Sequence, residues 1–177
     1  AAKSQSVSMR SSDDVMDMTP KILCLYALTA ALLRPCHAAG DTPPVIWLEA
    51  EQFAHTGTWS VDAQFVDIMG SVQLLATGCG KPVEDAATQA AVPVSGTYRL
   101  WVRCRDWLPD YSPGLFQVAI NGKASVTTFG KAPDDTWRWV DGGAFELQAG
   151  TVDVQLRDLT GWWGRCDAVV LAYGDFK

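Results

Sequence analysis

Two neighbouring tryptophans near the end of the chain lie between glycines, in the stretch Gly161-Trp162-Trp163-Gly164. On a strand, adjacent side chains point to opposite faces, so one ring would be buried and the other exposed. In a glycine-flanked turn, both rings can face outward. Trp107 lies in a second segment that is bounded by proline and glycine. Exposed rings of this size offer flat apolar surface for recognition.

Carboxylates form the second group of residues that could do chemistry. Glu49 and Glu51 are two positions apart, so on a strand they share one face. Two like charges side by side are unfavourable unless something positive lies between them. The pattern therefore predicts a bound cation, or ion pairs with an arginine such as Arg103 or Arg165.

The sequence offers little from which to build a catalytic site. His55 is the only histidine after residue 38, and no Ser-His-Asp context, GxGxxG or Walker sequence is present. Asp134-Asp135 indicate a turn. Carboxylate pairs such as Asp106 and Asp110 leave a small β-sandwich glycan lyase or hydrolase as an alternative class.

The first 38 residues have the layout of an export signal. One lysine precedes a twelve-residue apolar run at 22–33, and small residues flank a cleavage point after Ala38. A buried core helix is the alternative, and the run is shorter than the roughly 20 residues of a transmembrane helix. We expect a secreted, periplasmic or cell-surface protein. The predicted organisation is an upstream segment at 1–17, a signal peptide at 18–38, a linker at 39–44 and one domain at 45–177.

The part after residue 38 is acidic, with ten Lys and Arg against seventeen Asp and Glu. This balance argues against nucleic acid and, after signal cleavage, a membrane as partners. Three cysteines remain in it: Cys79, Cys104 and Cys166. An oxidising compartment allows one bridge, with Cys104 and Cys166 as the favoured pair, and two buried free thiols are the alternative.

Short apolar alternations recur after Pro44, separated by Gly, Pro and Asn-Gly, and no useful helical period occurs. Many short strands with turn signals predict an all-β sandwich. Asn121-Gly122 indicates a type I′ hairpin, which needs positive φ at both positions. Long loops are expected at 53–70, 106–114 and 158–165. The predicted strands span 45–51, 71–76, 86–92, 97–105, 115–121, 126–129, 137–140, 144–147, 151–157 and 166–173.

Five motifs follow one another along residues 45–173: Glu49-Ala50-Glu51, a Pro-x-x-Gly-x-Tyr turn at 93–98, a strand closed by Asn-Gly at 116–122, Phe145 to Gly150, and Gly164-Arg165-Cys166-Asp167. In this order they resemble carbohydrate-binding modules of the galactose-binding-like β-sandwich type, families 6 and 35. The resemblance implies a two-sheet jelly roll that binds polysaccharide without catalysis and targets an attached enzyme to its substrate. It extends to modules attached to FAD-linked oxidoreductases. An N-terminal accessory domain with a structural or protein-interaction role is therefore the second interpretation.

The resemblance also implies a structural Ca²⁺. Glu49, Glu51 and Asp167 match the positions that supply its side-chain ligands in these families, and hard oxygen ligands suit this ion. Ala168 departs from the pattern, because an aromatic residue usually follows the aspartate there.

In the resembling families the ligand binds at the loop tip between the sheets, so the resemblance implies a sugar site where loops 105–114 and 158–166 meet. Aromatic rings would stack on the C–H faces of the sugar, with polar groups around its rim. Arg105, Asp106 and Arg165 could hydrogen-bond hydroxyls or a uronate carboxylate. The remaining tryptophans at 47, 59 and 101 are expected to pack in the sheets or core, and at least one of those at 137 and 139 to pack inside. The predicted carbohydrate-binding residues are Trp107, Tyr111, Trp162, Trp163, Arg105, Asp106 and Trp137.

Overall fold

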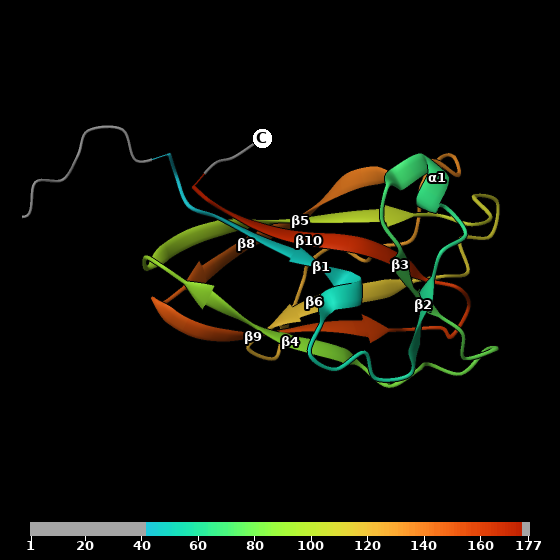
Figure 1. Ribbon diagram of the computed structural model, residues 1–177, viewed down its shortest axis with the longest axis horizontal. Helices are drawn as coiled ribbons and strands as arrows, with labels where there is room; N and C mark the ends of the chain where they lie inside the picture. Colours follow the sequence, from blue (N-terminus) through green and yellow to red (C-terminus); the bar gives the residue numbers. More distant parts are fainter. Residues whose placement is uncertain (1–41, 175–177) are drawn as a thin grey trace, which may run out of the picture. The chain divides into compact units, whose positions relative to one another are not determined.

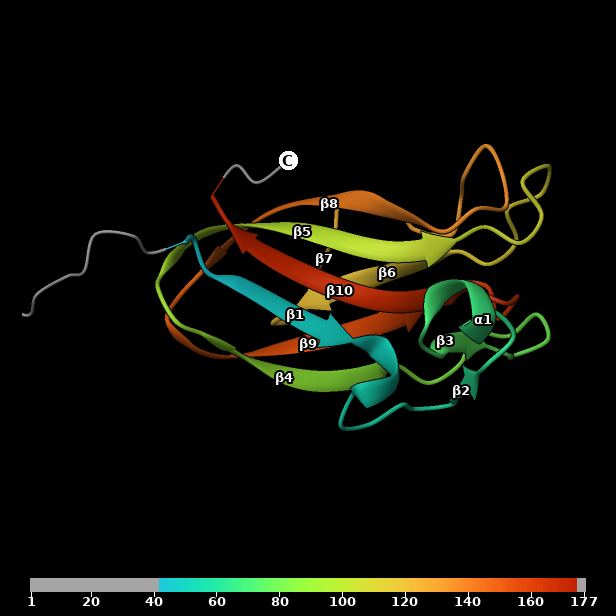
Figure 2. The same cartoon turned by 45° about the horizontal axis from the view of Figure 1, so that its top comes forward.

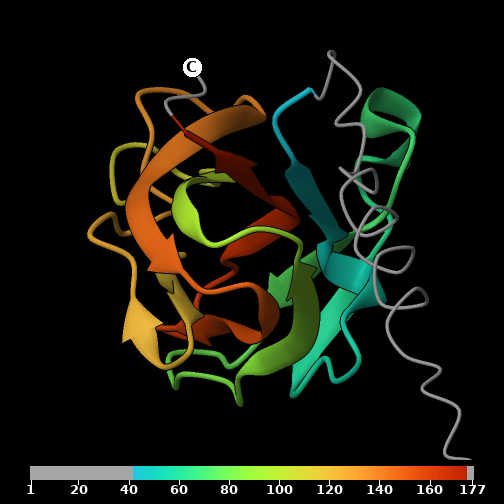
Figure 3. The same cartoon turned by 90° about the vertical axis from the view of Figure 1, so that its left-hand side faces the viewer.

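The computed structural model describes residues 42–174, so the predicted upstream segment and signal peptide lie outside the described residues. Within this range, no helix is long and apolar enough to cross a membrane. Two antiparallel sheets pack face to face as a sandwich (Figures 1 and 3). The prediction of an all-β, two-sheet architecture is confirmed.

The central strand of sheet A is β10, because it pairs with β1 and β3 along one edge and with β5 along the other. Two short helices, η1 (Ala50–Gln52) and α1 (Val66–Met69), lie in the connection from β1 to β3. Sheet A has the order β2 (Trp59–Asp62), β3 (Gln73–Ala76), β10 (Arg165–Tyr173), β5 (Gly96–Arg105) and β8 (Arg138–Leu147), with β1 (Val45–Glu49) also on β10. Sheet B has the order β4 (Ala86–Val92), β9 (Gly150–Asp158), β6 (Phe116–Ile120) and β7 (Lys123–Ala124).

The alternation of residues in β5 shows why the two sheets stack. Tyr98, Leu100, Val102 and Cys104 point into the core and are all buried, while the residues at 99, 101, 103 and 105 face outward. Fully burying a Leu- or Val-sized side chain contributes roughly 1.5–3 kcal/mol, and a slip of one position would reverse every face of the strand.

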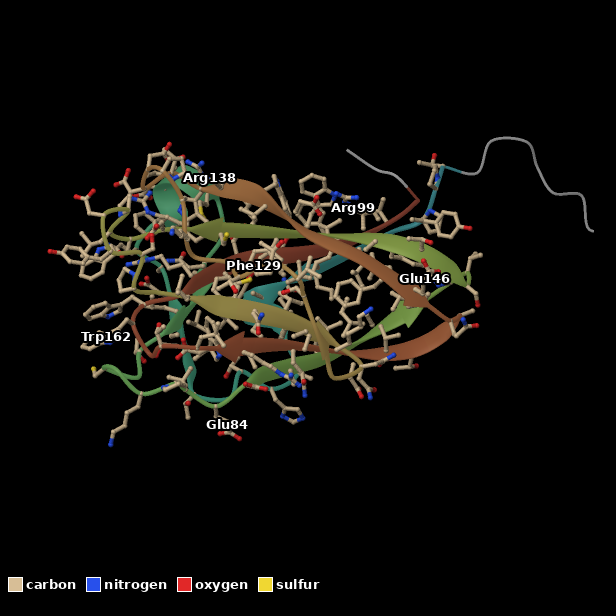
Figure 4. All side chains as sticks on the ribbon, turned by 180° about the vertical axis from the view of Figure 1, so that it is seen from behind. Glu84, Arg99, Phe129, Arg138, Glu146 and Trp162 are labelled. Atoms are coloured by element: carbon tan, nitrogen blue, oxygen red, sulfur yellow. The ribbon has the colours of Figure 1, made fainter. Side chains whose placement is uncertain are left out.

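Aromatic residues fill the space between the sheets. Phe116 and Phe129 are fully buried, with ring centroids 5.5 Å apart, and Figure 4 shows Phe129 between the layers. Trp59 packs edge-on against Phe116 at 5.8 Å and is 4% exposed, so the prediction that it belongs to the core is confirmed.

Several predicted boundaries differ from the structure. The first strand ends at Glu49, where η1 begins, so Glu51 is not on the strand. Residues 126–129 form no strand, and only Phe129 pairs, with Phe116. The two strands predicted at 137–140 and 144–147 are one strand, β8, whose register shifts opposite Leu100. The loop expected at 53–70 contains both β2 and α1.

The hairpin at Asn121-Gly122 is confirmed, with φ of +48° and +79° at the two positions. Cys104 and Cys166 are direct partners across β5 and β10, and both are buried free thiols. Of the two outcomes that the sequence left open, a Cys104–Cys166 bridge and buried free thiols, the structure has the free thiols.

Strand direction brings four connections to one end of the sandwich, called the loop end below. β5 ends at Arg105, β8 begins at Arg138 and β10 begins at Arg165, and these three strands are neighbours in sheet A. The loops before or after them, and the segment that carries α1, lie together at the right of Figures 1 and 2. This end carries most of the aromatic residues that the sequence singles out.

Candidate functional site

Three tryptophans from two loops form a continuous ring cluster at the loop end. The ring centroids of Trp107 and Trp163 lie 4.5 Å apart, and those of Trp162 and Trp163 lie 4.9 Å apart. Trp107 is 38% exposed and Trp162 is 37% exposed, and Figure 4 shows Trp162 at this end. The predicted meeting of the two loops therefore brings these three rings into contact. We call Trp107, Trp162 and Trp163 the loop-end cluster.

The backbone around Trp162 and Trp163 is held tightly by neighbouring loops. The Trp163 amide donates to the carbonyl of Ala76 at 2.8 Å, and Trp163 itself has a φ of +57°. Positive φ is uncommon for a bulky residue and indicates a conformation imposed by its surroundings. Gly161 has a φ of +72° and lies directly against the backbone of Lys81, where a side chain would collide.

The loop that carries Trp107 has its own buried anchor. Asp106 is 1% exposed, and its carboxylate accepts hydrogen bonds from the hydroxyl of Ser112 at 2.7 Å and the amide of Ala132 at 2.9 Å. A third hydrogen bond comes from the amide of Leu108 at 3.2 Å. The prediction that Asp106 contacts a ligand is corrected: its carboxylate is buried and already satisfied, so it positions the loop.

Two other predicted residues of this loop region are exposed to different degrees. Tyr111 is 81% exposed at the loop tip. Arg105 is half-buried and pairs with the exposed carboxylate of Asp135 at 2.9 Å. Tyr111 is therefore open to a molecule on the loop end, whereas the Arg105 side chain is only 15% exposed and Asp106 is buried.

Arg165 lies beneath the ring cluster without a carboxylate partner among the described residues. It is 3% exposed and is the direct cross-strand partner of Arg105. Its guanidinium carbon is 5.7 Å from the ring centroid of Trp107, and one of its nitrogens donates to the carbonyl of Trp163 at 3.2 Å. Burial, and next the charge of Arg105, lower the pKa of Arg165 to about 10, so the guanidinium stays protonated at neutral pH. A protonated guanidinium therefore lies under the rings, and the charges of Asp62 and Asp106 act on it in the opposite direction to that of Arg105.

Phe65 also belongs to this site, because its ring contacts both Arg105 and Arg165. The sequence alone did not identify it. Phe65 lies directly before α1, and the guanidinium of Arg105 lies 4.3 Å from its ring centroid. Arg165 approaches the same ring at 5.8 Å, and Trp137 packs edge-on against it at 5.8 Å. The sequence predicts only a long loop at 53–70. No local pattern in that loop indicates that Phe65 lies against Arg105 and Arg165.

Two tryptophans on the outer face of sheet A also differ from expectation. Trp47 in β1 is 54% exposed, although it was expected to pack in the sheet. Trp139 in β8 is 39% exposed, and the two ring centroids lie 5.2 Å apart in an edge-to-face arrangement. Trp137 is half-buried against Phe65, so neither Trp137 nor Trp139 packs inside the core. We call Trp47 and Trp139 the sheet-face pair.

The three carboxylates of the expected cation site lie near one another. Burial raises the pKa of Glu51, a backbone hydrogen bond opposes this, and the charges of Glu49 and Asp167 raise it further. One oxygen of Glu51, Oε2, is buried without a partner. Asp167 accepts hydrogen bonds from the Ser71 hydroxyl and from the Arg103 guanidinium, each at 3.0 Å.

This donor set fits a hard cation in its chemistry, because an unpartnered buried carboxylate oxygen faces a concentration of negative charge. The arrangement is not a complete coordination sphere: among residues 42–174, no group of three or more His, Cys, Asp or Glu side chains is placed so that it could hold a metal ion. Asp167 already accepts hydrogen bonds from Arg103 and Ser71, so only its remaining lone pairs would be available to a cation.

Comparison with solved structures places this sandwich among known folds. A family 35 carbohydrate-binding module from Clostridium thermocellum aligns with a TM-score of 0.57 and 19% identity, over 71% of this chain and 97% of that one. The C-terminal CBM6 of a marine laminarinase from Zobellia galactanivorans aligns with a TM-score of 0.53 and 15% identity, over 73% of this chain and 99% of that one. The fold is that of family 6 and family 35 carbohydrate-binding modules.

A larger protein contains the same fold. The GH26-CBM35 β-(1,4)-mannanase of Podospora anserina aligns with a TM-score of 0.59 and 21% identity, over 77% of this chain. The matched part is 29% of the mannanase, so this chain spans less than a third of its length. No family model matches the sequence, and the search of curated proteins finds no match. At these identities, the likeness to carbohydrate-binding modules concerns the fold.

Proposed function

We propose that the chain is a non-catalytic carbohydrate-binding module that takes a polysaccharide on its loop-end cluster. The observation that carries the proposal is the contact of Trp107, Trp162 and Trp163 at an exposed end of the sandwich. Indole rings bury large apolar area against the C–H face of a sugar, whereas a neutral hydrogen bond in water nets only about 0.5–1.5 kcal/mol. Tyr111 and Arg105 supply polar groups at the rim.

The electrostatics of the site favour a sugar that carries an acidic group. Arg105 and Arg165 are like charges directly opposite each other on neighbouring strands, which is unfavourable without an anion nearby. Asp135 is the only carboxylate within ion-pair distance of either guanidinium among residues 42–174, and it is mostly exposed. A uronate carboxylate near Arg105 would compensate this charge.

Catalysis explains the residues at the loop end less well than carbohydrate binding does. A glycosidase needs one carboxylic acid with a raised pKa. Asp134 has the opposite shift, because hydrogen bonds from Arg138 and Thr136 hold its pKa well below the usual range. Asp106 is buried under the loop, and Asp135 is paired with Arg105. Three of the four aspartates that suggested a hydrolase are therefore engaged in other contacts, and the fourth, Asp110, is exposed on the loop.

Affinity electrophoresis tests the proposal directly. Native gels would contain galactomannan, xylan, laminarin or polygalacturonate, and the variants would be Trp107→Ala and Trp162→Ala. We expect retention by at least one polysaccharide, weakened about tenfold or more in each variant. Val94→Ala is the control, because Val94 is an exposed apolar residue before β5, at the opposite end of the sandwich. Equal retention of all four proteins would refute the proposed site.

We also propose that Glu51, with Glu49 and Asp167, holds a structural Ca²⁺. The unpartnered Oε2 of Glu51 supports this, because a cation would satisfy it.

Further, we propose that the module is exported and carries an attached enzyme to its substrate. The mannanase comparison, in which the matched part is a fraction of the enzyme chain, supports that arrangement. An accessory domain that contacts protein would instead show no retention by any polysaccharide.

A further inference from the structure

We infer that a small monovalent anion of the chloride kind binds beneath Phe65, between the side chains of Arg105, Arg165 and Trp137. The site lies on the outer face of sheet A at its loop end, under the segment that carries α1 (Figures 1 and 2). The ion would belong to the folded domain whether or not saccharide is bound. The inference therefore goes beyond the proposed function and does not depend on it.

Strand register places the three side chains on one face of the sheet. Arg105 faces outward like the other odd-numbered residues of β5, and Arg165 is its direct partner on β10. Trp139 is opposite Arg103, so Trp137, two positions earlier, lies on the same outer face. Two guanidinium groups and one indole ring thus come together at the end of three neighbouring strands.

The ring of Phe65 covers this group of side chains. The guanidinium carbons of Arg105 and Arg165 lie 4.3 Å and 5.8 Å from its ring centroid. The ring of Trp137 packs edge-on against it, with centroids 5.8 Å apart. The charge of Arg105 also contributes, after burial, to the lowered pKa of Arg165, as expected for neighbouring guanidinium groups. All three side chains therefore surround one small volume.

Each of these side chains has a buried N–H group that lacks an acceptor among residues 42–174. The groups are Nε of Arg105, Nε of Arg165 and Nε1 of Trp137. Arg165 as a whole is only 3% exposed. A buried donor without an acceptor is costly, and more so when it is charged. Three such donors around one volume call for a guest that only accepts hydrogen bonds and carries negative charge, which describes an anion.

The carboxylates nearby do not satisfy these donors. Asp135 pairs with Nη2 of Arg105 at 2.9 Å, and Nε remains unpartnered. The charges of Asp62 and Asp106 act on Arg165, but within the described part of the chain neither carboxylate forms an ion pair with it. Both already accept hydrogen bonds from other groups. Two guanidinium charges with one paired carboxylate leave one charge to neutralise, which makes the ion monovalent.

Other guests fit these donors less well. Oε1 of Gln73 is a buried acceptor without a partner, but its strand β3 lies on the side of β10 remote from β5. Gln73 can therefore serve Arg165 and not Arg105 or Trp137. A water molecule brings two protons that need acceptors of their own. A uronate carboxylate carries a sugar ring, and the three N–H groups are buried, so at the rim it would meet Nη2 of Arg105 instead.

Chloride-35 NMR of the full chain tests the inference without any saccharide. Chloride is raised at constant ionic strength against methanesulfonate, and the wild type should broaden the chloride line in a saturable manner. Trp137→Phe removes one N–H group and keeps an aromatic ring, so it should weaken chloride affinity about tenfold. Trp101→Phe is the matched control, because Nε1 of Trp101 is also buried and unpartnered but lies four positions from Arg105 along β5. Its chloride affinity should equal that of the wild type.

The outcomes separate this inference from the proposed function. No saturable broadening by the wild type overturns the inference, and so does equal chloride affinity of Trp137→Phe and the wild type. Competitive displacement of chloride by galacturonate also overturns it, because the buried donors would then belong to the saccharide site. Should Trp137→Phe lose melting temperature, a wild-type crystal soaked in bromide decides: an anomalous peak between the Nε atoms of Arg105 and Arg165 supports the inference, and no peak there overturns it. None of these results changes the retention by polysaccharide that tests the proposed function.

Discussion

The loop-end cluster and the sheet-face pair present the same residue type in two different ways. At the loop end, the rings sit on irregular backbone that depends on a positive φ at Trp163, the close approach of Gly161 to Lys81 and the buried carboxylate of Asp106. On the sheet face, strand register alone places Trp47 and Trp139. The loop-end cluster therefore depends on supports far apart in the sequence, and the sheet-face pair depends on the sheet that the fold forms in any case.

This difference predicts where each group of rings is vulnerable. Substitutions beneath the loop end should lower stability and binding together, because the same contacts hold the backbone and orient the rings. Substitutions of the sheet-face rings should have little effect on folding, because strand register holds the backbone there.

The largest effect is expected from Gly161→Ala. The new side chain would collide with the backbone of Lys81, and Gly161 has a φ of +72°. Left-handed strain costs about 1–2 kcal/mol and overpacking a further 1–3 kcal/mol, so we expect a loss of about 3 kcal/mol in the free energy of unfolding, with loss of saccharide retention. Urea denaturation measures the first and affinity electrophoresis the second. Gly122→Ala is the control: its φ is +79° with nothing within 4 Å, so only the strain should remain.

Asp106→Ala should come next in size. It leaves three donors, from Ser112, Leu108 and Ala132, without their acceptor inside the loop. The loss of this buried charged acceptor should cost about 2–3 kcal/mol of unfolding free energy and weaken retention through Trp107. Asp135→Ala, which removes a mostly exposed carboxylate at the same end, should cost less than about 1 kcal/mol. Equal losses in the two variants would mean that Asp106 is no anchor.

The cation site offers a third comparison, through Glu51→Gln. Since the pKa of Glu51 is raised, the folded wild type binds a proton more readily than the unfolded chain. Without a cation, this contribution to wild-type stability should be fully present below pH 4.5, should be lost as pH rises through the raised pKa, and should not change further above it, whereas the variant should be flat in this window. At pH 7, Ca²⁺ at 100 times its dissociation constant should stabilise the wild type by about 2.7 kcal/mol and leave Glu51→Gln unchanged. Melting curves with EDTA and with Ca²⁺ measure both, and a wild type that is indifferent to both reagents contradicts the cation.

The smallest effect concerns Cys79, which reports on the loop end alone. Cys79 is exposed, and its neighbour Gly80 is so close to the Trp162 ring that an added Cβ would lie 2.9 Å from it. We expect a saturating disaccharide to slow the labelling of Cys79 by a thiol reagent about threefold, because the ligand covers this corner. Burial raises the pKa of Cys104 to about 11, so Cys104, like the fully buried Cys166, should stay unlabelled until the chain unfolds. Peptide mapping distinguishes the three cysteines, and equal labelling of Cys79 with and without the disaccharide would contradict this prediction.

Much of the fold was predictable because it depends on local alternation. The period-2 pattern of β5 and the Asn121-Gly122 turn each specify their geometry within a few residues. The loop end was predictable only in outline: the glycines around Trp162 and Trp163 indicated exposed rings. The burial of Asp106 and the contact of Phe65 with Arg105 were not predictable, since both depend on segments that meet only in the folded chain.

The register-dependent features were missed for a different reason. Trp47 and Trp139 lie on strands, where alternation predicts that one face is buried and cannot say which. Glu51 was placed on a strand because the apolar alternation continues past Glu49, whereas the chain turns into η1 at Ala50. In both cases, the outcome depends on which strand lies next to which.

Indole NMR spectra of the wild type, recorded during titration with a saccharide that affinity electrophoresis has identified, test the central claim most directly. The account predicts that the indole signals of Trp107, Trp162 and Trp163 shift in a saturable manner with one dissociation constant, while that of the buried Trp59 stays in place. Saturable binding of the saccharide that leaves all three loop-end signals unmoved would contradict it.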